Sequence, residues 1–549
     1  MRRVWALVAL VLAVCATAAL AAGGRDPTFE TNGFAIVDDP GAENESLADV
    51  QVLPDGKILA VGGHGGAGGF LVLRLNPDGS PDGTFGPGGI RVQPDNNLPG
   101  DPRVLSGMET QPDGRIVAAG LGRGPGGFNA FGFARYLSGG GVDSSFGDGG
   151  GIKVVGAPAG YVAGDAFDVA VAGGGRVVGA GSLLKMGGGS LAAALALDSS
   201  GQPVPSFGGG GTGFAVVNVP GSTGEQANAV EALPGGGLLL GGVANGAFLA
   251  KLDDSGQLVP DFGSGGMAVH DLGTSPSSSG SIEDLEVLND GRILATGSSA
   301  PGQLFVARFL ANGDVDPSFG TGGKVLLDPT PALDAGLGLA LTSDGRILVA
   351  GISHNDDLNS AVWVLRLLHD GAPDLAFGPV GDRVFDLTEG LDGAAAVALQ
   401  PDGKAVIAGS ASPGGGASQL MVGRLRGDPR PGSCFGKTAT ITGTPKGESI
   451  RGTRRRDVIA AQGGRDRIRG LGGNDVACGG AGSDVIRAGA GRDRVNGGQG
   501  NDRLFGGTGK DLLLGGSGKD RLGGGGGPDL CRGGSGRDLA GCEREPGVP

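Results

Sequence analysis

Short apolar runs separated by turn sequences fill the first three quarters of this chain. In the stretch 47–86, apolar runs at 50–53, 57–61 and 70–75 alternate with a Pro-Asp-Gly turn, a glycine-rich loop and an Asn-Pro-Asp-Gly turn. Runs of this length between such turns predict β-strands. A Phe closes the stretch, and the same pattern then begins again.

The closing Phe recurs eight times, at steps of 55 to 61 residues. The eight positions are Phe29, Phe85, Phe146, Phe207, Phe262, Phe319, Phe377 and Phe435. They enclose seven units, and each unit offers four candidate strands. Seven repeats of four antiparallel strands predict an all-β fold, a seven-bladed β-propeller over residues 22–436 that exposes only short strand edges. An open solenoid of the same strands is the alternative.

Several of these repeats carry the same sequence motifs. PDGKIL, FLVLRLNPDGS and the Phe-Gly mark together resemble the bacterial delta-60 repeat. The resemblance implies a propeller in an exported or surface protein, and it implies no particular activity.

Two charged positions recur at a fixed distance from the Phe marks. Four units have Arg eleven residues before the Phe and Asp three residues before it. These are Arg74 and Asp82, Arg135 and Asp143, Arg308 and Asp316, and Arg366 and Asp374. We predict that each pair is a structural ion pair between the last strand and the loop that leads to the next blade. A ring of arginines around a bound anion is the alternative.

From residue 443 the chain advances in steps of nine residues. The acidic position recurs in register at Glu448, Asp457, Asp466, Asp475, Asp484, Asp493, Asp502, Asp511, Asp520, Asp529 and Asp538. Units such as GGAGSDVIR and GGQGNDRLF fit G-G-x-G-x-D-x-U-x, and they resemble the RTX, or haemolysin-type, calcium-binding repeat. The resemblance implies a parallel β-roll over residues 437–549.

Electrostatics gives a separate reason for a cation in this segment. If two nonapeptides make one coil, carboxylates 18 residues apart stack at the strand spacing of about 4.8 Å. They then repel by about 3.5 kcal/mol per pair at an effective dielectric of 20. Calcium, which prefers carboxylate and carbonyl oxygens, would relieve that repulsion.

We therefore predict a calcium site along this column of acids. The expected ligands are Asp475, Asp484, Asp493, Asp502, Asp511 and Asp520, with weaker sites at Asp457, Asp466, Asp529 and Asp538 and none at Glu448. Basic neighbours such as Arg465 and Arg494 offer an alternative, a roll whose carboxylates are neutralised without metal.

Cysteine usage favours an oxidising compartment. Apart from Cys15 near the start, the cysteines are Cys434, Cys478, Cys531 and Cys542. Three coils separate Cys478 from Cys531, about 14 Å along a regular roll, which exceeds the reach of a disulfide. We expect the pairs Cys434–Cys478 and Cys531–Cys542, one at each end of the roll. A zinc site is the alternative, although no Cys-x-x-Cys spacing supports it.

The first 21 residues have the features of a secretory signal peptide. Arg2 and Arg3 precede an apolar stretch that ends in Ala19-Leu20-Ala21. We expect cleavage after Ala21, export, and no transmembrane segment in the mature chain. An uncleaved membrane anchor and lipid attachment at Cys15 are the alternatives.

Charge and motif content argue against some classes of function. The net charge of −14 is uneven, since residues 437–549 hold 19 Lys/Arg and 13 Asp/Glu, a net of +6, and the rest carries −20. This balance argues against nucleic acid as a partner. The sequence contains no G-x-S-x-G, H-E-x-x-H or phosphate-loop motif.

These observations predict a secreted or cell-surface protein that binds calcium and is not an enzyme. We expect a scaffold or adhesion protein whose propeller binds an extracellular or cell-surface partner that the sequence does not identify. A hydrolase or lyase in the central pocket of the propeller is the alternative. Converging carboxylates with shifted pKa values in the channel would favour the enzyme, and small channel residues would favour the scaffold.

Overall fold

A computed structural model gives the fold of the chain. It describes residues 23–30, 32–38, 44–63, 69–93, 105–273, 280–299, 302–327, 335–342, 345–356, 359–375, 377–378, 380–400, 402–412, 416–427, 433–435, 437–444, 446–535 and 539–542. The predicted signal peptide and Asp538 lie outside the described residues. The chain divides into two compact units between Arg426 and Gly427, earlier than the boundary predicted at residues 436 and 437.

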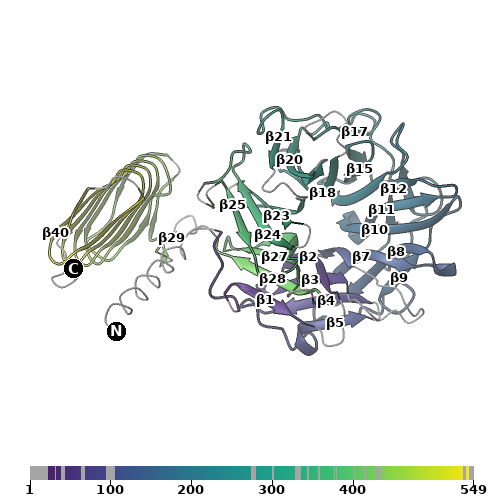
Figure 1. Cartoon of the computed structure of the whole chain (residues 1–549), viewed down its shortest axis with the longest axis horizontal. Helices are drawn as coiled ribbons and strands as arrows, with labels where there is room; N and C mark the ends of the chain where they lie inside the picture. The colour runs from purple at the N-terminus through teal and green to yellow at the C-terminus, as the bar shows by residue number, and fades with distance from the viewer. Residues whose placement is uncertain are drawn as a thin grey trace. The chain divides into compact units, whose positions relative to one another are not determined.

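The first unit is a β-propeller of seven four-stranded antiparallel sheets arranged around a centre (Figure 1). Blades 1 to 3 are β2(Ser46–Val52) β3(Ile58–Gly63) β4(Phe70–Leu75) β5(Ile90–Gln93), β6(Leu105–Thr110) β7(Ile116–Arg123) β8(Asn129–Tyr136) β9(Ile152–Val155), and β10(Tyr161–Ala172) β11(Arg176–Lys185) β12(Ser190–Leu197) β13(Phe214–Val217). Blades 4 and 5 are β14(Gln226–Ala232) β15(Leu238–Val243) β16(Ala247–Leu252) β17(Met267–His270), and β18(Gly280–Val287) β19(Ile293–Ser299) β20(Gln303–Phe309) β21(Lys324–Leu327). Blade 6 is β22(Ala335–Leu341) β23(Ile347–Asp356) β24(Asn359–Leu367) β25(Asp382–Phe385). The all-β class and the seven four-stranded blades are confirmed.

The last blade joins the two ends of the propeller. It contains β26(Gly393–Leu399), β27(Ala405–Ala411) and β28(Gln419–Leu425), and its outer strand is β1(Phe34–Val37) from the start of the unit. Phe34 pairs with Gly423 and Val37 with Leu420. The ring is therefore closed, which excludes the open solenoid.

The strand that follows each Phe mark belongs to the blade before it. In blade 1, β5 comes after Phe85 but pairs with β4, as Leu73 opposite Ile90 shows. The sequence units between Phe marks are thus offset by one strand from the blades. The eighth mark, Phe435, lies in the second unit and closes no blade.

The innermost strand of each blade contains a β-bulge at the same position. In blade 1 the register shifts between Leu47 and Asp49, opposite Gly62. A Cβ on Gly62 would lie 1.9 Å from the carbonyl oxygen of Ser46, so only glycine fits there. Gly181, Gly242, Gly297, Gly351 and Gly409 face the same close approach in other blades. The sequence analysis did not single out this glycine, although it recurs at one phase of the repeat.

The hydrophobic core of the propeller lies between neighbouring blades. One buried cluster joins Leu71 of β4 to Ala408 of β27, and another joins Phe131 of β8 to Leu183 of β11. The Phe marks interlock the blades as well, because the ring of Phe85 packs beneath Gly140 in the turn of the next blade. A Cβ on Gly140, whose φ is +83°, would lie 2.1 Å from that ring.

The second unit is a parallel β-roll, as predicted, with two six-stranded sheets. One sheet holds β31(Ile441–Thr442), β33(Val458–Ala460), β35(Val476–Ala481), β37(Arg494–Gln499), β39(Leu512–Ser517) and β41(Leu530–Ser535). The other holds β32(Ser449–Arg451), β34(Arg467–Gly472), β36(Val485–Ala490), β38(Arg503–Thr508), β40(Arg521–Gly526) and β42(Leu539–Gly541). A short hairpin, β29(Ser433–Cys434) and β30(Lys437–Thr438), precedes them.

Helical structure among the described residues is limited to three 3₁₀ turns. These are η2(Pro87–Gly89), η3(Pro125–Gly127) and η4(Gly173–Gly175). No helix in the described part of the chain is long and apolar enough to cross a membrane.

Candidate metal centre

The nonapeptide register sets the geometry of the β-roll. Residues 18 apart pair in parallel strands, for example Ile468 with Ile486 and Leu504 with Leu522. The apolar residue two positions after each acid is buried at Ile459, Ile468, Ile486, Val495, Leu504, Leu513 and Leu522. Two nonapeptides therefore make one coil, and the apolar positions fill its narrow core.

The same register places the side chains of the recurrent aspartates inside the roll. Asp457, Asp466, Asp475, Asp484, Asp493, Asp502, Asp511, Asp520 and Asp529 are each at most 6% exposed. In the eight from Asp466 to Asp529, the carboxylate oxygen Oδ1 accepts a hydrogen bond from the backbone N–H of the acidic residue one coil earlier. Asp502 Oδ1 accepts a hydrogen bond from the backbone N–H of Asp484 at 2.8 Å, and Asp520 Oδ1 accepts one from Asp502 at 2.9 Å.

The second carboxylate oxygen lacks a partner at six of these positions. Oδ2 is buried without a hydrogen bond in Asp466, Asp475, Asp484, Asp493, Asp502 and Asp511. Burial, followed by the repulsion of neighbouring carboxylates, raises the pKa of Asp502 to about 7. It raises the pKa of Asp484 and Asp493 to about 6. An ionised carboxylate in this setting needs a positive partner.

The basic neighbours do not supply that partner in the described part of the roll. Arg465, Arg494 and Arg503 are exposed, and the buried Oδ2 atoms make no hydrogen bond to them. The geometry thus speaks against the charge-paired alternative.

The buried carboxylate oxygens point into a space beside a glycine. A Cβ on Gly497 would lie 2.4 Å from Asp502 Oδ2 and 2.6 Å from the carbonyl oxygen of Gly515. A Cβ on Gly506 would lie 2.5 Å from Asp511 Oδ2 and 2.6 Å from the oxygen of Gly524. A carboxylate and a main-chain carbonyl therefore converge where glycine leaves room, and such oxygens are the ligands that calcium prefers.

Two nonapeptides differ at this glycine position. Ala461 precedes Asp466 by five residues and Ala488 precedes Asp493 by five, where the other units have glycine. Both alanines are buried, at 0% and 1% exposure. Their methyl groups stand at the position that glycine leaves open elsewhere in the column.

The first units of the roll satisfy their acids internally. Asp457 Oδ2 accepts hydrogen bonds from the N–H of Thr453 at 2.6 Å and from its hydroxyl at 3.0 Å. Glu448 accepts one from the N–H of Thr444. These two acids therefore already have hydrogen-bond donors within their own units; their predicted weakness as calcium ligands stays a prediction.

The donor set suits calcium better than a transition metal. In the described residues, no group of three or more His, Cys, Asp or Glu side chains gathers around one point. A cation here would draw most of its ligands from main-chain carbonyls, which calcium accepts and zinc disfavours. The residues of the roll therefore fit calcium.

Two disulfides link residues of the roll. Cys434 pairs with Cys478 at a Cα–Cα distance of 5.6 Å, and Cys531 pairs with Cys542 at 6.0 Å. All four cysteines are used, which leaves none for zinc. Both pairings are those expected from the sequence.

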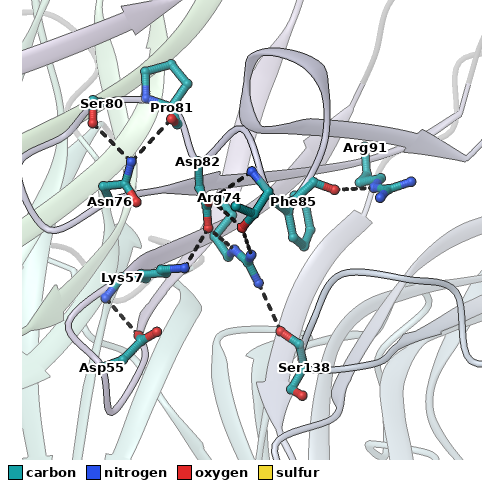
Figure 2. A network of polar contacts seen from close by, with 11 residues as sticks. Asp55, Lys57, Arg74, Asn76, Ser80, Pro81, Asp82, Phe85, Arg91 and Ser138 are labelled. Carbon is teal, nitrogen blue, oxygen red and sulfur yellow. Dashed lines mark hydrogen bonds and ion pairs between the residues drawn. The ribbon is translucent and has the colours of Figure 1, made fainter.

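In the propeller, by contrast, the structure brings each predicted Arg next to its Asp. Arg74 Nε lies 2.7 Å from Asp82 Oδ2, in a network that includes Lys57, Thr84 and the carbonyl of Ser138 (Figure 2). The equivalent distances are 2.8 Å for Arg135 and Asp143, 2.7 Å for Arg308 and Asp316, and 2.8 Å for Arg366 and Asp374.

The guanidinium groups of these arginines also lie over the rings of the recurrent Phe residues. The guanidinium of Arg74 lies 4.6 Å from the ring centre of Phe85. In blade 3, where Ala196 replaces the arginine, Arg176 reaches Phe207 from another strand, at 5.7 Å. Each site is filled by protein groups, which argues against a ring of arginines around an anion.

A fifth pair joins the two ends of the propeller. Arg424 Nε lies 2.8 Å from Asp26 Oδ2, and its guanidinium lies 4.7 Å from the ring of Phe29. Burial by itself raises the pKa of Asp26, but hydrogen bonds from Thr28 and the charges of Lys404 and Arg424 bring it down to about 2. The sequence analysis missed this pair, although Asp26 has the expected spacing from Phe29.

A second group of carboxylates lies on the innermost strands and was also missed. Asp49, Asp168 and Asp284 occupy the bulge position in alternate blades. Each accepts a backbone N–H from the next blade, as Asp168 Oδ2 does from Val230 at 2.8 Å. Burial, together with the neighbouring charges of Asp49 and Glu109, raises the pKa of Asp168 to about 7.

One cavity, which lies between blades 6, 7 and 1, is lined by residue types that occur in hydrolase active sites. It has a volume of about 320 Å³ and is lined by His354, Ser360 and Asp392 among others. Ser360 Oγ donates its hydrogen bond to the main-chain oxygen of Asp392 at 2.9 Å, and the Asp392 carboxylate accepts from Leu387 and Thr388. These contacts are not those of a Ser-His-Asp triad, in which serine donates to histidine.

Family models match segments of both structural units. The RTX calcium-binding nonapeptide repeat matches residues 442–477, 479–513 and 505–540. A β-propeller domain of unknown function, DUF5122, matches residues 53–85, 111–146, 288–319 and 342–377. The chain carries a DUF5122 propeller and RTX calcium-binding repeats.

Some solved structures are distantly similar to this chain. A protein of unknown function from Dyadobacter fermentans is 10% identical, with a TM-score of 0.41, over 73% of this chain and 100% of its own. A protein from Lactobacillus plantarum is 13% identical, with a TM-score of 0.36, over 70% and 100%. An ulvan lyase of polysaccharide lyase family PL25 is 11% identical, with a TM-score of 0.36, over 74% and 95%. No curated protein matches the chain.

Proposed function

We propose that this protein is an exported, non-enzymatic scaffold whose β-roll is completed by calcium and whose propeller binds an extracellular partner. The observation that carries the proposal is the set of six buried Oδ2 atoms without a hydrogen-bond partner. No other group in the described roll neutralises the charge of these carboxylates. The matching RTX family model names calcium as the ion that such repeats bind. Calcium, when bound, supplies the missing positive charge.

The ion sites are not equivalent along the column. Glycine leaves room beside Asp475, Asp484, Asp502, Asp511 and Asp520, and these residues would hold calcium with a main-chain carbonyl of the next coil. Ala461 and Ala488 fill the corresponding space at Asp466 and Asp493. Asp493 thus joins Asp466 as a weak member of the predicted set.

Export is supported by two independent features. The first 21 residues have a signal-peptide pattern, and both pairs of cysteines in the roll form disulfides, which persist in oxidising compartments. Calcium modules outside the cell work at about 0.1–1 mM. Mass spectrometry of the exported chain tests this, and the expected N-terminus is Ala22.

Calorimetry of the full chain with and without calcium tests the central proposal. One site at 100 times its Kd adds about 2.7 kcal/mol, so several filled sites should raise the melting temperature of the roll by more than about 15 °C. Trp363 is buried in blade 6, and residues 437–549 contain no Trp, so its fluorescence follows the propeller. We expect calcium to move the calorimetric transition of the roll and to leave the Trp363 transition in place. Absence of both a shift and bound metal would overturn the proposal.

A hydrolase or lyase remains the second candidate because of one observation. Three carboxylates on the innermost strands, Asp49, Asp168 and Asp284, have raised pKa values, and Asp168 and Asp284 are near enough to the others to be repelled by their charges. Their hydrogen bonds to the next blade give them a structural role, and small residues such as Gly107 and Gly338 occupy the bulge position in other blades. Turnover of a polysaccharide that Asp168→Asn abolishes without a change in melting temperature would favour the enzyme.

A further inference from the structure

One face of the β-roll carries two files of arginines. In the sheet of β32, β34, β36, β38 and β40, the position after the acid holds Arg467, Arg503 and Arg521. Two residues further along each strand, Arg451, Arg469 and Arg487 stand in register on three successive coils. All six side chains are exposed, and we call this surface the arginine face.

The described aspartates of the nonapeptides do not offset this charge at the surface, because they point the other way. All nine described aspartates of the nonapeptides, from Asp457 to Asp529, are buried inside the roll. Within the described residues, none of the six guanidinium groups forms an ion pair with a carboxylate. The surface of this sheet is therefore more positive than the net charge of +6 for residues 437–549 suggests.

The sheet holds these charges in a fixed line. Ile450, Ile468, Ile486, Leu504 and Leu522 alternate with the arginines and are buried in the core, so the backbone beneath the face is anchored. Parallel strands lie about 4.8 Å apart, so the five strands from β32 to β40 present their arginines over about 19 Å. Such a straight, rigid row suits an extended polymer better than a compact ligand.

An aromatic ring interrupts the second file. Phe505 pairs with Arg487 in the strand register and is 40% exposed, although it is a large apolar side chain. The guanidinium of Arg487 lies 5.2 Å from the centre of its ring. An exposed ring in line with arginines offers a stacking surface for a sugar beside contacts for its acidic groups.

We propose that the arginine face binds a linear anionic polysaccharide through its carboxylate or sulfate groups. Guanidinium groups pair with both anions in a bidentate manner. Nucleic acid shares the negative charge, but the two disulfides favour an oxidising compartment, where acidic polysaccharides are the more accessible polyanions. The face contains none of the candidate calcium ligands, so this binding is separate from the ion sites.

Binding of chondroitin sulfate to the full chain, at about 0.15 M NaCl and constant calcium, tests the proposal. Neutral dextran, duplex DNA and phosphatidylglycerol vesicles serve as comparison probes. We expect the protein to bind chondroitin sulfate, to ignore dextran, and to bind DNA and vesicles more weakly. The triple variant Arg467→Ser, Arg503→Ser, Arg521→Ser should weaken chondroitin sulfate binding by about tenfold or more, because it removes half of the charged contacts.

A matched variant separates this face from charge in general. Arg454, Arg455 and Arg456 are exposed on the turn before β33, outside both sheets. Replacing these three with Ser removes the same charge and should weaken binding by less than about threefold. Equal losses in the two variants, no binding of chondroitin sulfate, or tighter binding of DNA or vesicles would each overturn the proposal. Calcium-loaded melting of both variants verifies that the roll is folded.

Discussion

The propeller and the roll bury aspartate in opposite ways. In the propeller, Asp316 is 4% exposed and meets Arg308 at 2.7 Å, with further hydrogen bonds from Ser318. In the roll, Asp502 is 1% exposed, and its Oδ2 meets no donor. The same residue is thus neutralised by the chain in one unit and left charged or protonated in the other.

Because of this difference, the propeller needs no bound ion to be stable, whereas the stability of the roll depends on a cation or on protonation. A buried carboxylate with its own arginine is stable in any buffer, and removing either partner leaves the other charge unpaired. A buried carboxylate without a partner destabilises the fold until a cation arrives or a proton binds. The propeller should therefore fold irrespective of calcium, whereas the roll should respond to it.

Removing one acid from each unit tests this contrast most strongly. Asp316→Ala leaves the guanidinium of Arg308 buried and should cost about 3–5 kcal/mol with or without calcium. Urea unfolding followed by Trp363 fluorescence measures it. A double-mutant cycle with Arg308→Ala should show coupling, and independent effects would contradict the ion pair.

The matching change in the roll, Asp502→Asn, should behave in the opposite way. Without calcium it removes an unpaired charge and keeps the acceptor for the N–H of Asp484, so the roll should be no less stable. With calcium it should forfeit most of the gain from one site, about 2.7 kcal/mol at 100 times Kd. Calorimetry in the two conditions gives both values, and a large loss without calcium would show that Asp502 has a protein partner.

The pH dependence of the roll should reverse with calcium. The folded-state pKa of Asp484 and Asp493 is raised to about 6 and that of Asp502 to about 7, above the unfolded value of 3.8. Calcium-free, the roll binds more protons when folded, so its stability should be greatest below about pH 4 and fall as pH rises to about 7. With calcium, which requires ionised carboxylates, stability should rise over the same range. Melting curves at pH 5 and 7.5 are sufficient, and parallel trends would contradict the assignment.

Exchanging alanine and glycine beside the acids should change the number of bound ions. Ala488→Gly opens the space at Asp493 and should add about one calcium per chain. Gly506→Ala places a methyl group about 2.5 Å from Asp511 Oδ2 and should remove about one. Equilibrium dialysis counts the ions. An unchanged number in both variants would show that this position does not control access.

The smallest effect is expected at the rim of a propeller pair. Lys57 Nζ lies 2.8 Å from Asp82, but its side chain is 27% exposed, and Arg74 already neutralises the carboxylate. Lys57→Ala should cost only about 0–1 kcal/mol, as measured by urea unfolding with Trp363 fluorescence. A loss as large as that of Asp316→Ala would mean that the exposed lysine, and not the buried arginine, holds the loop.

Local periodicity explains how much could be predicted from the sequence. Strand pattern, turn residues and Phe marks repeat within each blade, so the seven blades and the proximity of Arg74 to Asp82 follow from spacing alone. The nine-residue register likewise fixes which residues fill the core of the roll and which acids stack. The spacing of the cysteines along the coils made Cys434–Cys478 and Cys531–Cys542 the expected pairs.

Only the tertiary structure decided how the ends meet and which way charges point. Asp26 and Arg424 are 398 residues apart, β1 and β28 likewise come from opposite ends of the propeller, and no local period contains these contacts. The bulge that brings Asp168 to the next blade arises from packing between inner strands. In the roll, the coil turns the nine described aspartates inward and the arginines of one sheet outward, which yields both the candidate cation sites and the arginine face. The sequence determined the repeats because they are local, and the structure determined the closure and the direction of the charges because those depend on contacts between distant strands.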